Sequence, residues 1–86
     1  MKISFHKQFE KKYKKLTAKQ KEKVKSKLAL FVENIFSPEL DNHALHGIYD
    51  GYRSISLTGD IRMIYKILDS ETILFVEIGK HSTLYK

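Results

Sequence analysis

Two runs of alternating apolar residues, 53–57 and 61–67, flank the tripeptide Thr58-Gly59-Asp60 and constrain the fold of this 86-residue chain most strongly. In both runs apolar side chains recur at every second position, which is typical of strands with one buried face. The tripeptide contains a glycine, which can supply the left-handed backbone that three-residue hairpin loops favour. The sequence therefore predicts an antiparallel hairpin.

The register of this hairpin follows from the same alternation. The apolar faces of the two strands coincide when Ile55 lies opposite Met63, and a shift by one residue would turn one face to solvent. The same register places Ser56 opposite Arg62 on the second face of the sheet. Asp60 then lies at the edge of that second face.

A third strand is predicted at 73–78, after a short polar turn. If the connecting loop has an even number of residues, Leu74, Val76 and Ile78 face the core. Phe75 and Glu77 then share the second face with the arginine. That face is predicted to be concave, partly polar and open.

The first half of the chain predicts a short strand at 2–5 followed by two helices. Apolar residues of the first helix recur at helical spacing at Phe9, Tyr13 and Leu16. Thr17 can cap the second helix while Gln20 reaches back, as in a capping box. The second helix carries the apolar stripe Val24, Leu28, Phe31, Val32 and Ile35. Proline disfavours helix at the residue before it, so this helix is predicted to end near Ser37-Pro38.

The length and composition bound the class of protein. Residues 1–86 are predicted to form one α+β domain, with the N-terminal helical hairpin packed on one face of a small antiparallel sheet. The absence of cysteine fits a reducing compartment. No apolar run is long enough for a membrane span, and no signal peptide is recognisable. We therefore expect a cytoplasmic protein without membrane contacts.

The charge of the chain is uneven. Residues 1–36 hold eleven lysines against three glutamates, whereas residues 37–86 hold five lysines and arginines against seven acidic residues. A basic block of this kind predicts a surface for a polyanion such as nucleic acid or the ribosome. The alternative is that the lysines only solvate the outside of two helices.

Four side chains predicted near one face could cleave RNA without a metal. In that reaction a 2′-hydroxyl attacks the adjacent phosphate, and a base, an acid and a positive charge are required. Histidine suits the proton-transferring roles and arginine suits the charged role. The candidates are His43, His81 and Arg62, with Asp60 as a second proton-handling group or as a partner that orients a histidine. No cofactor motif or metal site is recognised.

Each candidate also has a purely structural interpretation. Arg62 could pair across the sheet with Glu77 as a surface ion pair of little energetic value. Asp60 could be an ordinary turn residue. His81 and Tyr85 could belong to an unremarkable C-terminal tail, in which the tyrosine simply packs.

Several sequence pieces occur in a fixed order along the chain, namely Asn42-His43-Ala44-Leu45-His46-Gly47, Gly51-Tyr52-Arg53, Asp60, Tyr65-Lys66 and Gly79-Lys80-His81-Ser82-Thr83-Leu84-Tyr85. Together they resemble the YafQ-like branch of the RelE superfamily of bacterial type II toxins. The resemblance covers nearly the whole chain. It implies a helical hairpin on an antiparallel sheet and an activity that cleaves mRNA in the ribosomal A site without a metal.

The resemblance also implies roles for individual residues. His43, Asp60 and His81 match the acid–base residues of the YafQ branch. Arg62 matches a strand arginine of the RelE branch, where positive charge would stabilise the phosphorane. This resemblance therefore favours the same four catalytic candidates as the chemical argument.

Three further positions are predicted to contact the substrate. Tyr85 matches the terminal aromatic residue that lies against the substrate in the family. Lys66 belongs to the matching Tyr-Lys pair. Ser56 stands where the YafQ branch commonly has a histidine, and serine cannot exchange protons at neutral pH as imidazole does. Either Arg62 compensates for this departure or the activity is reduced.

The partners and alternatives follow from the resemblance. A toxin of this kind would bind a cognate antitoxin that is acidic and partly disordered, the 70S ribosome with A-site mRNA, and operator DNA only through the antitoxin. One alternative is a ParE-like inhibitor of gyrase with the same fold. Another is a decayed toxin that only binds its antitoxin and represses the shared promoter.

Overall fold

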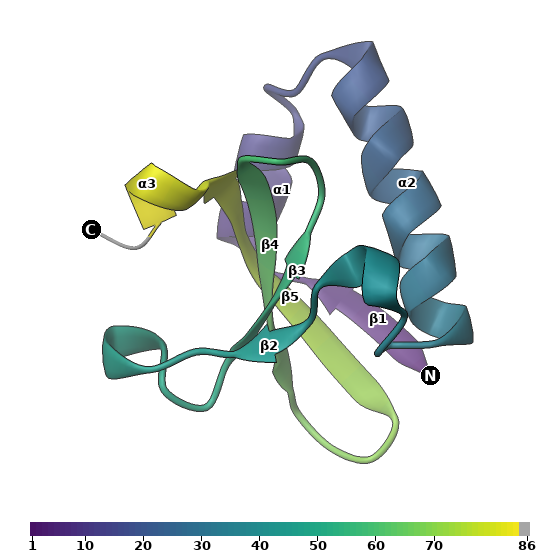
Figure 1. Cartoon of the computed structure of the whole chain (residues 1–86), viewed down its shortest axis with the longest axis vertical. Helices are drawn as coiled ribbons and strands as arrows, with labels where there is room; N and C mark the ends of the chain where they lie inside the picture. Colours follow the sequence, from purple (N-terminus) through teal and green to yellow (C-terminus); the bar gives the residue numbers. More distant parts are fainter. Residues whose placement is uncertain (85–86) are drawn as a thin grey trace.

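The computed structural model describes residues 1–84 (Figure 1). Its elements, in chain order, are β1 (Lys2–Phe5), α1 (Lys7–Tyr13), α2 (Ala18–Glu33), η1 (Pro38–Leu40), β2 (His43–Ala44), η2 (Gly47–Tyr49), β3 (Arg53–Ser56), β4 (Ile61–Ile67), β5 (Thr72–Lys80) and α3 (His81–Leu84), where η marks a 3₁₀ helix. Within these residues no helix has the length and hydropathy of a membrane span. The predicted α+β class is confirmed.

The five strands form one sheet in the order β1-β5-β4-β3-β2. Three of its pairs are antiparallel, but β1 runs parallel to β5, so the predicted all-antiparallel sheet is wrong and the sheet is mixed. A parallel pair needs a long crossover, and the two helices and three strands between β1 and β5 provide it. In Figure 1, α2 lies on one side of the sheet while α3 and the η2 loop lie on the other.

The β3–β4 hairpin has the predicted register. Ile55 pairs with Met63, and Ser56 pairs with Arg62. The predicted left-handed conformation of Gly59 is wrong, because Gly59 is not among the described glycines with positive φ. The loop is instead closed by the hydroxyl of Thr58, which accepts the backbone N–H of Ile61 at 3.1 Å.

The predicted face assignment of β5 is wrong for three of its residues. Phe75 lies in the core, fully buried, whereas Leu74 and Val76 lie outside the main core cluster. The cause is a β-bulge in β5. Ile64 pairs with Glu77 and Tyr65 pairs with Phe75, so Val76 has no partner in the register. A bulge of this kind changes the alternation of side chains by one residue.

The second helix begins as predicted, whereas α1 ends at Tyr13, before Leu16 of the predicted first helix. The hydroxyl of Thr17 accepts the backbone N–H of Gln20, and the Gln20 side chain accepts the backbone N–H of Thr17, which forms the capping box. The second helix ends at Glu33, four residues before the predicted end at Ser37. Its C-terminal cap, Asn34, turns the chain by accepting the N–H of Phe36 through its side chain.

The main core lies between these helices and the first face of the sheet. Three aromatic rings form its centre: Phe31 of α2 packs edge-on against Tyr65 and Phe75, with ring centroids 5.0 and 5.4 Å apart. Rings of this size bury large apolar areas and prefer such edge-to-face contacts. Along the predicted stripe of α2, Val24 is buried but Val32 is 50% exposed.

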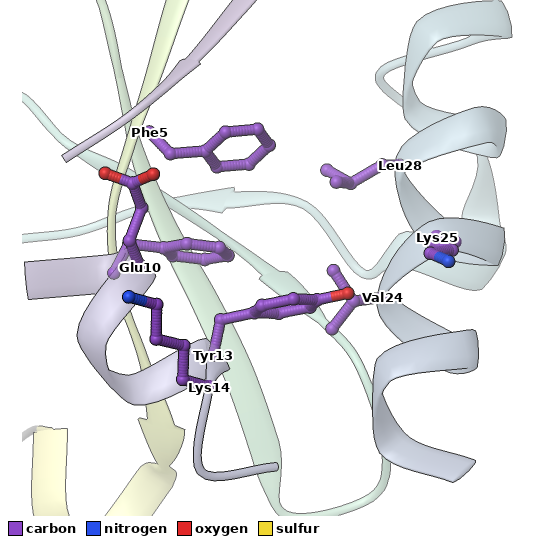
Figure 2. Close-up of a pocket in the computed structure, with 8 residues that line it drawn as sticks. Phe5, Glu10, Tyr13, Lys14, Val24, Lys25 and Leu28 are labelled. Carbon is purple, nitrogen blue, oxygen red and sulfur yellow. The ribbon is translucent and has the colours of Figure 1, made fainter. Parts of the chain in front are cut away.

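A groove separates the two N-terminal helices. Its cavity of about 390 Å³ is lined by Phe5, Phe9, Glu10, Tyr13, Lys14, Val24, Lys25 and Leu28. Figure 2 shows the side chains of β1 and α1 facing those of α2 across the gap. Most of this lining is apolar, and the charged residues come from the exposed faces of both helices.

Candidate active site

The second face of the sheet carries a buried arginine. Arg62 of β4 is only 8% exposed, and its guanidinium contacts protein atoms in three directions. Its Nε donates to the Ser54 hydroxyl at 2.6 Å, its Nη2 donates to the backbone carbonyl of Asp41 at 2.7 Å, and its Nη1 pairs with the Asp41 carboxylate at 3.2 Å. A buried charge requires this degree of hydrogen bonding.

The proposed ion pair between Arg62 and Glu77 is not formed. Glu77 instead pairs with Lys12 of α1 at 2.6 Å, so the arginine and the glutamate have different partners. The structural interpretation of Arg62 as a cross-strand surface pair is therefore wrong. Its burial also distinguishes it from a surface charge.

His43 lies beside this arginine. Its Nδ1 is 3.3 Å from Nη2 of Arg62 and 3.1 Å from the backbone carbonyl oxygen of Asp41. His43 is exposed and lies in the two-residue strand β2. The structure therefore brings together two of the four predicted catalytic residues, His43 and Arg62.

The segment that carries His43 is fixed from both sides of the sheet. On the first face, the amide of Asn42 donates to the Tyr65 hydroxyl and to the Ile35 carbonyl, both at 2.7 Å. The carbonyl oxygen of the same amide accepts Nε of Arg53 at 2.9 Å. On the second face, the neighbouring Asp41 contacts the buried arginine. The consecutive residues Asp41 and Asn42 are therefore anchored on opposite faces.

Asp60 and His81 are joined through their backbones where the β3–β4 hairpin loop meets the end of β5. The backbone N–H of His81 donates to the carbonyl of Asp60 at 2.8 Å, where β5 passes into α3. Both residues are exposed, and the Asp60 carboxylate accepts the Thr58 hydroxyl at 3.1 Å. Asp60 precedes Arg62 by two residues, about 7 Å along a strand. The backbone of Asp60 therefore lies close to that of Arg62.

Helix α3 folds back over the second face. Leu84 packs in a small cluster with Leu45 and Ile64. A Cβ at Gly79 would lie 3.3 Å from the Leu84 side chain, so glycine suits this close approach. Through this packing, the strand-to-helix junction that carries His81 has a defined place on the sheet.

The three predicted substrate contacts have different locations. The Ser56 hydroxyl donates to the Thr58 carbonyl at 2.8 Å, within the hairpin loop beside Arg62. Lys66 lies four residues beyond Arg62, about 13 Å along the strand, and its Nζ is 5.4 Å from the centre of the Tyr52 ring. The structure does not bring Lys66 to the histidines. Tyr85 lies outside the described residues.

Two functional neighbours were missed in the sequence. Ser54 could have been found, because the hairpin register places it on the same face as Arg62 and diagonal to it. Asp41 could not have been found from local pattern, since it contacts the arginine only through the turn after η1. Among residues 1–84, no three His, Cys, Asp or Glu side chains converge in a group that could hold a metal ion.

Comparison with known proteins identifies a family that this chain matches. The family described as bacterial toxin of type II toxin-antitoxin system, YafQ, matches residues 1–86. The mRNA interferase toxin RelE of Escherichia coli (strain K12) is 29% identical over 79 residues, which cover 91% of this chain and 80% of RelE.

Solved structures agree with this match. The crystal structure of YafQ from E. coli strain BL21(DE3) superposes with a TM-score of 0.78 at 26% identity, over 98% of this chain and 97% of that one. YafQ in the E. coli DinJ–YafQ toxin–antitoxin complex superposes with a TM-score of 0.75 at 27% identity, over 98% and 96%. The resemblance in the sequence is thereby confirmed: the chain belongs to the YafQ family of bacterial toxins of type II toxin–antitoxin systems.

Proposed function

We propose that this toxin is an endoribonuclease that cleaves mRNA on the ribosome by attack of a 2′-hydroxyl on the adjacent phosphate. The observation that supports this most directly is the contact of His43 with Arg62, together with the backbone hydrogen bond that joins Asp60, two residues before Arg62, to His81. The name of the curated relative RelE, an mRNA interferase toxin, points to the same substrate.

The proposed reaction uses one imidazole on each side of the phosphate. One ring accepts the proton of the attacking 2′-hydroxyl, the new bond to phosphorus forms, and the bond to the 5′-oxygen breaks. The other ring gives its proton to that leaving oxygen. His43 and His81 are the two proposed rings, and Asp60, whose backbone carbonyl accepts the His81 N–H, is the proposed second proton-handling group. The products are a 2′,3′-cyclic phosphate and a free 5′-hydroxyl.

The positive charge in this reaction comes from Arg62. Its fork is occupied by protein oxygens, so it acts as a fixed charge beside His43 rather than as a free bidentate ligand of phosphate. A fixed charge in a partly buried site costs no reorganisation when the phosphorane forms. This charge also supports the proposal that Arg62 compensates for the serine at position 56.

The lysines of α1 and α2 are the proposed contact with the ribosome. Three of them are engaged within the protein: Lys12 pairs with Glu77, Lys21 lies over the Tyr13 ring and Lys27 donates to the Glu39 carbonyl. The lysines left exposed on the two helices and the turn between them are Lys7, Lys11, Lys14, Lys15, Lys19, Lys23 and Lys25. Exposed cations of this density would attract the phosphates of ribosomal RNA.

The proposed inhibitor is a cognate antitoxin with an acidic, partly disordered segment. The complex of YafQ with DinJ supports a partner of this kind. The groove between α1 and α2 offers apolar contact area, and Lys14 and Lys25 line it (Figure 2). An acidic amphipathic segment would match both features. Contact with operator DNA is proposed only through the antitoxin.

The experiment that tests the proposed activity identifies the product. The chain is induced in a bacterial host, and new RNA 5′ ends and gyrase-dependent DNA breaks are mapped in the same cells. We expect 5′-hydroxyl ends within translated codons, and we expect them to disappear when translation is blocked before induction. DNA breaks without RNA ends would indicate the ParE-like alternative, and growth inhibition without either would overturn the nuclease assignment.

A further inference from the structure

The Nδ1 atom of His43 lies between a hydrogen-bond acceptor and a hydrogen-bond donor. The carbonyl oxygen of Asp41, 3.1 Å away, can only accept a hydrogen bond. The guanidinium nitrogen Nη2 of Arg62, 3.3 Å away, can only donate one. A neutral imidazole carries its hydrogen on one nitrogen, so Nδ1 can satisfy only one of these neighbours at a time.

We propose that Arg62 is a positioning residue: its Nη2 donates to the Asp41 carbonyl and fixes that oxygen beside the His43 ring, and the oxygen in turn holds the ring in the tautomer with hydrogen on Nδ1. In this state Nδ1 donates to Asp41, and Nε2 is the bare nitrogen that accepts the proton of the 2′-hydroxyl. The arrangement of the ring is a property of the free protein, whereas its use as a base rests on the proposed function.

The hydrogen-bond count around the guanidinium favours this tautomer. Nη2 of Arg62 has two hydrogens: one goes to the Asp41 carbonyl at 2.7 Å, and the Ser54 carbonyl at 3.3 Å can accept the other. Both hydrogens therefore have backbone acceptors without using His43. The Asp41 oxygen has a second lone pair for the His43 N–H. In this arrangement both hydrogens of Nη2 and the hydrogen of Nδ1 have acceptors.

Proton transfer is simple in the same arrangement. When Nε2 takes a proton, the ring becomes an imidazolium whose Nδ1 hydrogen stays on the Asp41 carbonyl, and no hydrogen of Arg62 has to move. In the other tautomer Nδ1 would accept from Arg62 and Nε2 would already carry its hydrogen. His43 could then accept no proton until the ring and the guanidinium rearranged.

The backbone at Asp41 supports a defined role for its carbonyl. Asp41 has φ of +46°, the one positive φ among the described residues other than glycine. Aspartate tolerates this left-handed conformation better than most residues, but it remains uncommon and often marks a functional position. The carboxylate of the same residue is 72% exposed, so its ion pair with Arg62 is expected to contribute little.

The test measures the tautomer directly in the full 86-residue chain without RNA. Long-range ¹H–¹⁵N spectra at a pH of about 9, well above the ordinary histidine pKa of about 6.5, distinguish hydrogen on Nδ1 from hydrogen on Nε2. We expect the Nδ1–H form of His43 to predominate at least fivefold. In Arg62→Lys and Ser54→Ala this preference should fall toward that of a free imidazole.

The matched control is Asp41→Asn, which keeps the carbonyl and removes only the ion pair, and its tautomer ratio should equal that of the unchanged protein. Single-turnover cleavage of ribosome-bound mRNA should slow at least tenfold in Arg62→Lys, with ribosome binding unchanged. A predominantly Nε2–H ring in the unchanged protein would overturn the proposal. If Arg62→Lys does not fold, an unaltered tautomer ratio in Ser54→Ala, which is the smaller change, would overturn the proposal as well. A confirmed tautomer with no RNA cleavage would instead contradict the proposed function alone.

Discussion

The two faces of the sheet are built by different interactions. The face under α1 and α2 is filled by apolar side chains, with the rings of Phe31, Tyr65 and Phe75 at its centre. The other face has only a small cluster around Ile64, beside which a buried arginine makes polar contacts with Ser54 and with the turn before β2. The first face consists mainly of packing, with the hydrogen bonds of Asn42 beside it, and the other combines a smaller packed cluster with the polar contacts of Arg62.

We expect the two faces to contribute differently to the stability of the fold and to the geometry of the site. Burying apolar area is the main favourable term in folding, so the first face is expected to supply most of the stability. A buried ion pair is weak evidence for stability, because desolvation offsets the attraction between the charges. The directional hydrogen bonds of Arg62 do, however, fix the positions of Asp41 and His43. We infer that the second face contributes mainly orientation.

The largest effect is expected from the first face. Phe31→Ala removes a fully buried ring and should lower the free energy of unfolding by about 3–5 kcal/mol, through lost transfer energy and the cavity that remains. Urea unfolding measures this loss, and Phe31→Leu, which keeps an apolar side chain, should lose less. Val32→Ala, at a half-exposed position of the same helix, is the control and should change stability far less. Equal losses for positions 31 and 32 would contradict the assigned face of α2.

The second-largest effect is expected from the second face and on the rate. His81→Ala should slow cleavage of ribosome-bound mRNA by roughly 10²–10³-fold, the range for loss of one acid–base group. Its free energy of unfolding should change by no more than about 0.5 kcal/mol, since the side chain is exposed. His46→Ala alters another exposed histidine and should cleave at the native rate. Cleavage by His81→Ala at the native rate would move the assignment to His43 with Asp60.

The strands of the sheet differ in how far their sequence determines them. The β3–β4 register could be predicted because the register that pairs Ile55 with Met63 puts the apolar side chains of both strands on the same face. The orientation of β5 could not, because the bulge at Val76 reverses the alternation and has no signal in a run of consecutive apolar residues. The parallel pairing of β1 depends on the path of the helices, which local pattern does not contain.

The candidate site divides in the same way. His43 and Arg62 could be chosen by residue chemistry, and the hairpin register placed Arg62 on the correct face. Their mutual contact could not be predicted, since it depends on the left-handed turn at Asp41, which brings a distant segment to the sheet edge. Long-range contacts of this kind follow from the assembled fold rather than from spacing along the chain.

The outer surface of the helix layer offers a third contrast, because it is charged rather than packed. Replacement of Lys11, Lys15, Lys19 and Lys23 by glutamate should weaken ribosome binding at least tenfold at low salt and make binding less dependent on salt, since fewer counterions are released. The fold should persist, because surface changes usually shift stability by about 0.5 kcal/mol or less each. Circular dichroism checks the fold, and sedimentation with ribosomes at several salt concentrations measures binding. Unchanged binding would leave these lysines as solvating residues.

The smallest effect is expected in the turn between β4 and β5, which belongs to neither face. Asp69 accepts the backbone N–H of Glu71 at 2.8 Å, and this hydrogen bond is the main cause that lowers the pKa of the Asp69 carboxyl below its ordinary value of 3.8. Because the folded state then binds the proton more weakly than the unfolded state, the charged carboxylate stabilises the fold above this pH. The contribution is lost as the pH falls through the lowered pKa.

Asp69→Asn isolates this charge, because the amide oxygen can still accept the same N–H. Urea unfolding at pH 7 should show the unchanged protein to be slightly more stable than Asp69→Asn, and the difference should shrink as the pH falls below about 3.8. Ser70→Ala changes the turn without a titrating group, so its difference from the unchanged protein should not depend on pH. A constant difference between pH 7 and pH 3 for Asp69→Asn would show that the turn gains nothing from the charge.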